Sequence, residues 1–151
     1  MPTAATPAPQ QGILVPGRSL GGARLGATAA QLRAVWGRAH GVCRSCATRT
    51  WYFNYRAFQP QGLGAELRHG RVTALFTVWQ PPSWRTREGV RLGDDASRLR
   101  AVYGVLAEET CAGYDAFVLG RGPARTVFYV HDGRVWGFGL LAPRVPVCRD
   151  G

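Results

Sequence analysis

The chain has 151 residues, of which 46% are hydrophobic, enough for one compact domain or for two small subdomains that share a core. Its net charge is +10, and all 19 basic residues are arginines dispersed from Arg18 to Arg149 with no run of three. This dispersal argues against a dedicated nucleic-acid patch, and no apolar run approaches the roughly 18 residues of a membrane-spanning helix.

The first 16 residues predict a disordered tail. They are rich in Ala, Pro, Thr and Gln, a composition that does not bury a core. They also lack the charged and apolar regions of a signal peptide, so no export signal is expected within the chain as written. Such segments often follow an export signal that has been removed.

Two segments of the chain have nearly the same sequence. Residues 22–37 read GARLGATAAQLRAVWG and residues 89–104 read GVRLGDDASRLRAVYG, which are identical at ten of sixteen positions at an offset of 67. Repetition of this kind indicates a duplicated structural unit. The sequence therefore predicts two tandem repeats, over 17–84 and 85–151.

Each repeat is predicted to begin with a short helix, over 29–36 and over 96–103. Thr28 is a good N-cap and opens a capping box, and Asp95 is the corresponding N-cap of the second helix. Both helices carry one apolar face. Because a two-turn helix is marginal in isolation, we expect both to pack on a sheet.

Four cysteines leave three possible interpretations. A redox motif at Cys43 and Cys46 would need a preceding strand and a following helix, whereas here a helix precedes and a strand-like run follows. A zinc site is disfavoured because Cys111 and Cys148 lie 37 residues apart. The third interpretation is two structural disulfides, Cys43–Cys46 and Cys111–Cys148, the second of which would hold 143–151 on the body.

Six strands are predicted from runs of aromatic and β-branched residues. They cover 50–56, 63–68 and 71–79 in the first repeat, and 114–119, 125–131 and 134–141 in the second. His69-Gly70 and Asp132-Gly133 predict hairpin turns. The expected fold class is α+β, with two tandem α-β-β-β repeats forming one antiparallel sheet of about six strands and both helices on one face.

That arrangement leaves the other sheet face open, and aromatic and arginine side chains are candidates to occupy it. Side-chain alternation places Trp136 and Phe138 there, with Gly137 and Gly139 toward the second helix; the alternative is that Trp136 and Phe138 belong to the core. Trp, Tyr and Arg are enriched in binding hot spots. The candidate partner-binding residues are Trp79, Trp136, Phe138, Tyr52, Arg56, Arg71 and Trp84.

The segments 25–37 and 92–104 share a Leu-Gly entry, a Thr or Asp cap, a helical Leu and a closing Gly, and Phe128–Val135 reads as a hairpin ending in Asp-Gly-Arg-Val. This pattern resembles the superfamily that joins the β-lactamase inhibitor proteins to the small outer-membrane lipoprotein of the barrel-assembly machinery. The resemblance implies tandem copies, export, and protein–protein binding without catalysis. The chain departs from the family at Ala39 and Leu106, where the family often has Pro.

No catalytic motif is present around the three histidines or the serines, and no cofactor or metal is expected. The expected function is an exported protein, secreted or in the cell envelope, that binds another protein without catalysis, as an inhibitor or an envelope adaptor. One alternative is an arginine-rich protein that binds nucleic acid or an anionic envelope polymer, with a steep dependence on salt. A second alternative is an enzyme of unknown type.

Overall fold

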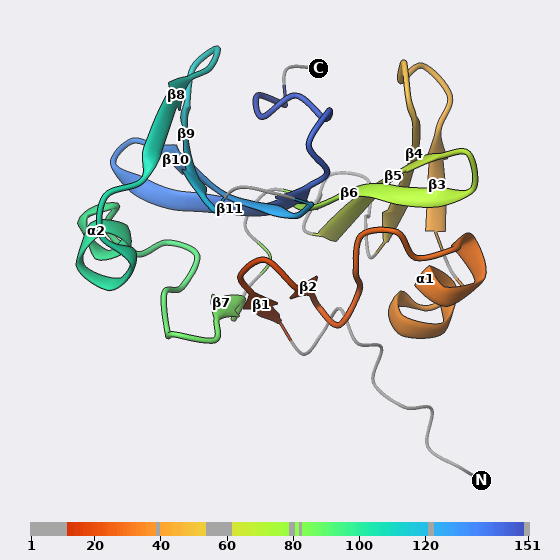
Figure 1. The fold of residues 1–151 in the computed structure, drawn as a ribbon, viewed down its shortest axis with the longest axis horizontal. Helices are drawn as coiled ribbons and strands as arrows, with labels where there is room; N and C mark the ends of the chain where they lie inside the picture. Colours follow the sequence, from red (N-terminus) through yellow and green to blue (C-terminus); the bar gives the residue numbers. More distant parts are fainter. Residues whose placement is uncertain are drawn as a thin grey trace, which may run out of the picture.

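The computed structural model describes residues 12–38, 40–53, 62–78, 81, 83–120 and 123–149. In chain order its elements are β1 (Ile13–Val15), β2 (Ser19–Leu20), α1 (Ala29–Trp36), β3 (His40–Cys43), β4 (Arg49–Phe53), β5 (Gly62–Arg68), β6 (Arg71–Val78), β7 (Arg85–Thr86), α2 (Ser97–Tyr103), β8 (Ala107–Thr110), β9 (Asp115–Leu119), β10 (Arg125–His131) and β11 (Arg134–Leu141) (Figure 1).

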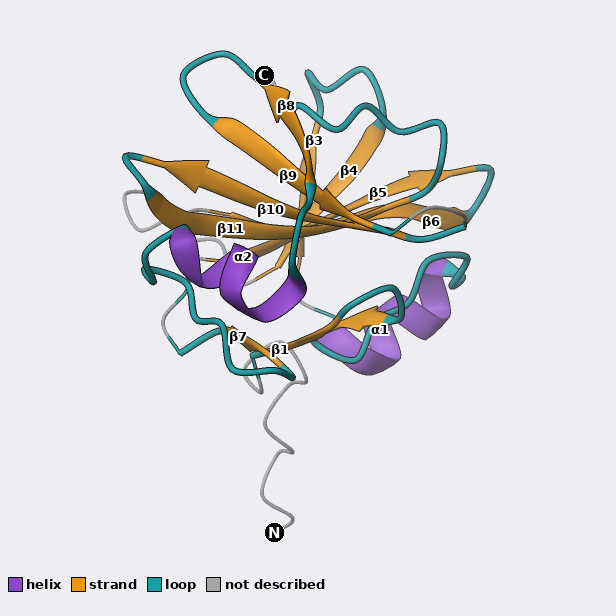
Figure 2. Cartoon of the chain, turned by 60° about the vertical axis from the view of Figure 1, so that its left-hand side comes forward, coloured by secondary structure: helices purple, strands orange, loops and turns teal. Residues whose placement is uncertain are grey.

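Eight of the strands form one antiparallel sheet in the order β3-β4-β5-β6-β11-β10-β9-β8. Each helix is followed by four of these strands, and the two sets of four meet where β6 pairs with β11. Three short strands form a second sheet in the order β2-β1-β7. The helices and this small sheet cover one face of the large sheet, which we call the helix face (Figure 2).

The predicted fold class is wrong. The described chain is mostly β, and its large sheet has eight strands instead of six, with a three-stranded sheet in addition. The two unpredicted strands of the large sheet, β3 and β8, have four residues each and lie at its two edges. They are too short, and too poor in alternating apolar residues, for a strand pattern to be recognised.

The predicted tail over 1–16 extends too far. Ile13–Val15 forms β1, which pairs antiparallel with β2 and parallel with β7. Leu14 is fully buried in the core. The order of this segment therefore depends on pairing with a strand about 70 residues away, which local composition does not reveal.

The helices begin with different caps. In α1 the Thr28 hydroxyl oxygen accepts the Gln31 N–H at 3.2 Å, and the Gln31 side chain accepts the Thr28 N–H at 2.9 Å, which completes the predicted capping box. In α2 the N-cap is Ala96 in place of the predicted Asp95. The Asp95 carboxylate instead accepts the Ser97 N–H at 2.9 Å, and this bond lowers the pKa of Asp95.

The loops that enter the two helices make the same contacts with the large sheet. In each loop a glycine donates its N–H to a strand carbonyl and accepts a hydrogen bond from an arginine of the same strand. These bonds join Gly26 with Val72 and Arg71, and Gly93 with Val135 and Arg134. The segments that share sequence therefore also share local geometry.

A β-bulge interrupts side-chain alternation in β11. The register of β10 against β11 shifts between Tyr129 and Val130 and leaves Trp136 as an extra residue. Val135 and Phe138, three residues apart, therefore both face the helices, and Phe138 is fully buried. The prediction that alternation places Trp136 and Phe138 on one open face is wrong because it assumed a regular strand.

Strand β6 has the same irregularity at Thr73. Val72 and Leu75 pack in the helix-face core, whereas Ala74 and Phe76 belong to a second apolar cluster on the opposite face. The two bulges lie at matching places in the two hairpins. Each half of the sheet therefore presents aromatic side chains to both faces.

Candidate functional site

The face of the large sheet opposite the helices is partly covered by the end of the chain. Figure 1 shows β3–β4 and β8–β9 rising on either side of the C-terminal segment, so we call this face the concave face. Residues 142–149, here called the strap, follow β11 and return across it. The prediction of an open sheet face is therefore wrong for the middle of the sheet. A sheet with apolar residues on both sides needs two covering layers.

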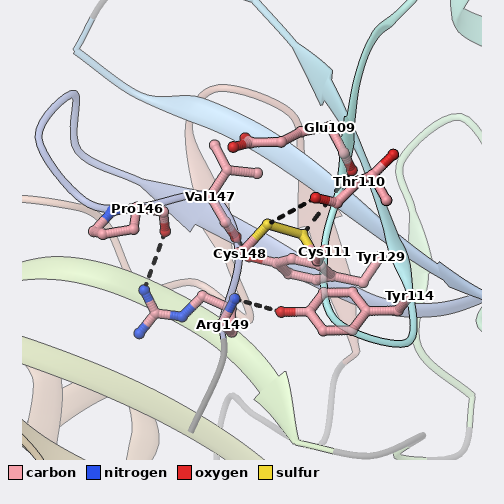
Figure 3. The surroundings of a disulfide bond; sticks show 9 residues. All are labelled: Glu109, Thr110, Cys111, Tyr114, Tyr129, Pro146, Val147, Cys148 and Arg149. Atoms are coloured by element: carbon pink, nitrogen blue, oxygen red, sulfur yellow. Dashed lines mark hydrogen bonds between the residues drawn. A yellow bond between two sulfur atoms is a disulfide. The ribbon is translucent and has the colours of Figure 1, made fainter.

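The strap is fixed at several points. Both disulfides, Cys43–Cys46 and Cys111–Cys148, are present, and the second joins the strap to the residue after β8. The Tyr129 hydroxyl donates to the Val147 carbonyl at 2.8 Å. Other hydrogen bonds run from Arg125 to the carbonyls of Ala142 and Val145, and from the Ala142 N–H to the Thr73 carbonyl. Figure 3 shows the disulfide and the bond from the Arg149 N–H to the Tyr114 hydroxyl.

A second apolar cluster lies between the strap and the sheet. Val147 is 8% exposed and packs against buried side chains of β6, β9, β10 and β11. These buried residues are Ala74, Ala116, Val127, Tyr129 and Leu141. The strap is thus a structural layer of the molecule and is held by apolar contacts as well as by the disulfide.

Aromatic rings lie over glycines on the floor of this face. A Cβ at Gly139 would lie 3.0 Å from the Tyr129 ring, and one at Gly137 would lie 3.7 Å from it. In the other half, a Cβ at Gly64 would lie 2.3 Å from the ring of Phe76. Gly137 and Gly139 therefore admit an aromatic ring on the concave face, and the expectation that they face the second helix is wrong.

Beside the strap this floor continues into a hollow of about 310 Å³, here called the aromatic hollow. Its walls include Tyr114, whose ring centroid is 5.9 Å from that of Tyr129, and Trp136, whose centroid is 5.5 Å from that of His131. His131 Nδ1 lies 3.0 Å from the Gly113 carbonyl oxygen, which ties the end of β10 to the β8–β9 turn. The residues around the hollow are Phe76, Thr77, Gly113, Tyr114, Tyr129, His131, Trp136, Gly137 and Arg149.

Arg149 separates the aromatic hollow from a second hollow nearer β4. Its guanidinium lies 5.1 Å from the Phe76 ring centroid and forms an ion pair with Glu66. Burial lowers the pKa of Arg149, and burial raises the pKa of Tyr129 well above its ordinary value. Arg149 remains a cation at neutral pH, and Tyr129 remains a neutral hydrogen-bond donor.

Two of the predicted partner-binding residues lie on the concave face. Trp136 is half-buried and lines the aromatic hollow, because its position in the bulge turns it away from the core. Tyr52 is half-buried and lines the second hollow, together with Glu66 and Arg149. The strap lies between them, so they do not form one continuous patch.

The other predicted partner-binding residues do not join them. Phe138 and Trp84 are buried in the helix-face core, Trp84 at 4% exposure. Arg71 is exposed at the end of its hairpin and donates to a carbonyl of the loop before α1. Trp79 and Arg56 lie outside the described residues.

Most of the residues around the aromatic hollow are not among the partner-binding residues predicted from the sequence. A usable signal was present in β10, where Tyr129 and His131 alternate with the buried Phe128 and Val130. Arg149 could have been placed only through its neighbour Cys148, once that cysteine was paired with Cys111. The residues of the aromatic hollow could therefore be grouped only after the disulfide partner of Cys148 was known, and the spacing of the cysteines alone does not identify that partner.

The aromatic hollow offers apolar and aromatic contact more than it offers reactive groups. The described residues around it include one imidazole and one paired guanidinium, and no carboxylate, thiol or amine. Within the described part of the chain, no group of three or more His, Cys, Asp or Glu residues could hold a metal ion. Neither described helix has the length and apolar character needed to cross a bilayer.

The close approach of Phe76 to Gly64 gives a test of the floor. Replacing Gly64 with Ala should lower the free energy of unfolding by about 1–3 kcal/mol, because the new methyl group would displace the Phe76 ring from beneath Arg149. Gly41→Ala is the control, since a Cβ at Gly41 of β3 meets no atom within 4 Å. Urea denaturation checks this, and equal stability of the two variants would contradict it.

No protein-family model and no curated protein matches the chain. Solved structures with a similar fold include an extracellular protein containing an SCP domain from Bacillus anthracis, at 11% identity and a TM-score of 0.53, covering 79% of this chain and 44% of that one. A DUF4309 family protein, YjgB, from Bacillus subtilis has 15% identity and a TM-score of 0.56, covering 77% and 78%. A cysteine-rich secretory protein from Staphylococcus aureus has 9% identity and a TM-score of 0.55, covering 85% and 47%.

The predicted resemblance to the inhibitor and lipoprotein superfamily is wrong, since the matching structures are SCP-domain and DUF4309 proteins. The residues behind that prediction form a helix cap and a hairpin turn, which are local features that many folds share. At these identities the similarity extends to the fold alone. The chain spans less than half the length of two of these proteins, one described as extracellular and one as secretory.

Proposed function

We propose that the chain is a non-catalytic binding domain of an exported protein, and that the aromatic hollow receives an apolar side chain of a protein partner. The observation that carries this proposal is an aromatic-lined hollow of about 310 Å³ beside the strap, on a face that the strap partly covers. Ligand sites are concave and mostly apolar, with a few polar groups that fix orientation. The aromatic hollow has this composition.

Export is supported by the two disulfides, which persist in oxidising compartments. It is also supported by the extracellular and secretory descriptions of two structural neighbours. The absence of a nucleophile paired with a base among the described residues around the aromatic hollow favours binding over catalysis. A protein partner is favoured because Trp and Tyr, which line the hollow, are the residues on which protein interfaces most often depend.

A random peptide library displayed on phage should test this proposal. Peptides enriched on the wild-type protein should carry an aromatic or large aliphatic residue that enters the aromatic hollow. Replacing Trp136 with Ala should weaken their binding at least about tenfold, or about 1.4 kcal/mol, because one wall of the hollow is removed. Fluorescence anisotropy of labelled peptides would measure the change in Kd.

Arg100→Ala is the control, because Arg100 of α2 is exposed and lies outside both the aromatic hollow and the two outer strands. This variant should bind the enriched peptides as the wild type does. The proposal would be overturned if Trp136→Ala bound the same peptides with unchanged affinity while remaining folded by circular dichroism. It would also be overturned if no peptide were enriched over an unrelated protein.

A further inference from the structure

The two outer strands of the large sheet each have one free edge. In the described part of the chain, β3 pairs only with β4, and β8 pairs only with β9. Free strand edges carry unpaired N–H and C=O groups that can accept another strand. The edges are also firmly held, because β3 ends at the disulfide cysteine Cys43 and β8 is followed directly by Cys111.

Exposed apolar side chains occur at these two edges. Among the described residues, the large apolar side chains that are exposed are Val42, at 53%, and Val105, at 93%. Val42 lies within β3, and Val105 comes two residues before β8. An apolar side chain beside an unpaired edge favours burial against a partner strand.

The two edges carry opposite charge. Residues 33–53, which include β3, contain four arginines and no Asp or Glu, so their net charge is +4. Residues 101–120, which include β8, contain two Glu and one Asp and no Lys or Arg, so their net charge is −3. The side chains next to the edges, Arg38 and Arg44 on one side and Glu108 and Glu109 on the other, are exposed.

This charge pattern selects one combination of edges. Two β3 edges, or two β8 edges, would bring like charges together, whereas β3 against β8 brings opposite charges together. The geometry agrees with this choice. The eight strands alternate in direction, so β3 and β8 run in opposite directions. If the sheet of a second copy continues the first sheet, β3 of one copy and β8 of the other therefore form an antiparallel pair.

We propose that copies of this chain associate head to tail, with β3 of one copy pairing with β8 of the next to extend the sheet. The partner is a second copy because one chain carries both complementary edges. Such an interface leaves one β3 and one β8 free at the ends, so association continues beyond a dimer unless a ring closes. Two four-residue strands bury little area, so the association is weak and depends on concentration.

Charge reversal at each edge tests the proposal by sedimentation velocity at protein concentrations up to about 0.5 mM. The weight-average sedimentation coefficient of the wild type should rise with concentration, and about 0.5 M NaCl should reduce the rise. Glu108→Arg with Glu109→Arg changes the net charge of 101–120 from −3 to +1, so that both edges are basic. Arg38→Glu with Arg44→Glu, the acidic-edge variant, lowers the net charge of 33–53 from +4 to zero and so removes the attraction to the β8 edge. Each variant alone should remain monomeric, and an equimolar mixture should associate again.

Arg24→Glu with Arg91→Glu is the control, because it changes net charge as much as the acidic-edge variant but at exposed positions outside both edges. This control should associate as the wild type does. A wild type that stays monomeric at every concentration would overturn the proposal. So would edge variants that associate like the wild type, or a mixture that remains monomeric.

Discussion

Removal of the Cys111–Cys148 disulfide should lower the free energy of unfolding by about 4 kcal/mol. The bond closes a loop with a sequence separation of 37 residues, and the chain-entropy estimate for a loop of that size is about 4 kcal/mol. The matched comparison is Cys43–Cys46, where a separation of three residues corresponds to only about 2 kcal/mol. Each pair is replaced by Ala, and the midpoint and slope of urea unfolding give the two losses.

The structure also predicts which segment becomes less stable when the Cys111–Cys148 disulfide is removed. Without the Cys111 bond, the strap keeps its contacts through Tyr129, Arg125 and Glu66, but local opening becomes easier. Hydrogen exchange should therefore increase over 142–149 and at Tyr114, while α1 and its capping box stay protected. Equal losses for the two disulfides, or unchanged exchange of the strap, would contradict the role of this bond as the anchor of the strap.

The features that the sequence predicted are those coded by neighbouring residues. The capping box at Thr28, the hairpin turn at Asp132-Gly133 and the first helix over 29–36 depend on side chains and glycines within one or two turns of chain. A local hydrogen bond or a positive φ favours particular residue types at particular positions, so it can be recognised from the sequence. These elements therefore lie where the sequence indicates them.

The sheet face that each side chain occupies was harder to predict, because a single inserted residue moves all the side chains beyond it to the opposite face. The bulge positions are Thr73 and Trp136, which share no side-chain property that would mark an insertion. Side-chain alternation is regular in β10, which has no inserted residue, and it is broken in its neighbour β11, where the prediction had assumed it. The error moved Phe138 from the core to a supposed surface.

The strap was missed for a different reason. Its link to the sheet was foreseen through Cys148, but the layer it forms depends on Val145 and Val147 meeting residues of β6, β9 and β10 as well as of the preceding strand β11. No short-range pattern specifies that contact. The aromatic hollow is bounded partly by Arg149 of the strap, so the site could not be assembled without it.

Replacing Phe138 with Ala should destabilise the protein by about 3–5 kcal/mol, because the ring is fully buried and packs edge-on against Phe128 with centroids 6.0 Å apart. Trp136→Ala, two residues away, should cost much less, because its side chain is half-buried at the wall of the aromatic hollow. The two variants thus distinguish the two faces of the sheet. Phe138→Ala should lose stability, and Trp136→Ala should lose binding of the enriched peptides. Urea unfolding and anisotropy measured on both variants check this, and similar stability losses would place the two side chains on the same face, against the bulge at Trp136.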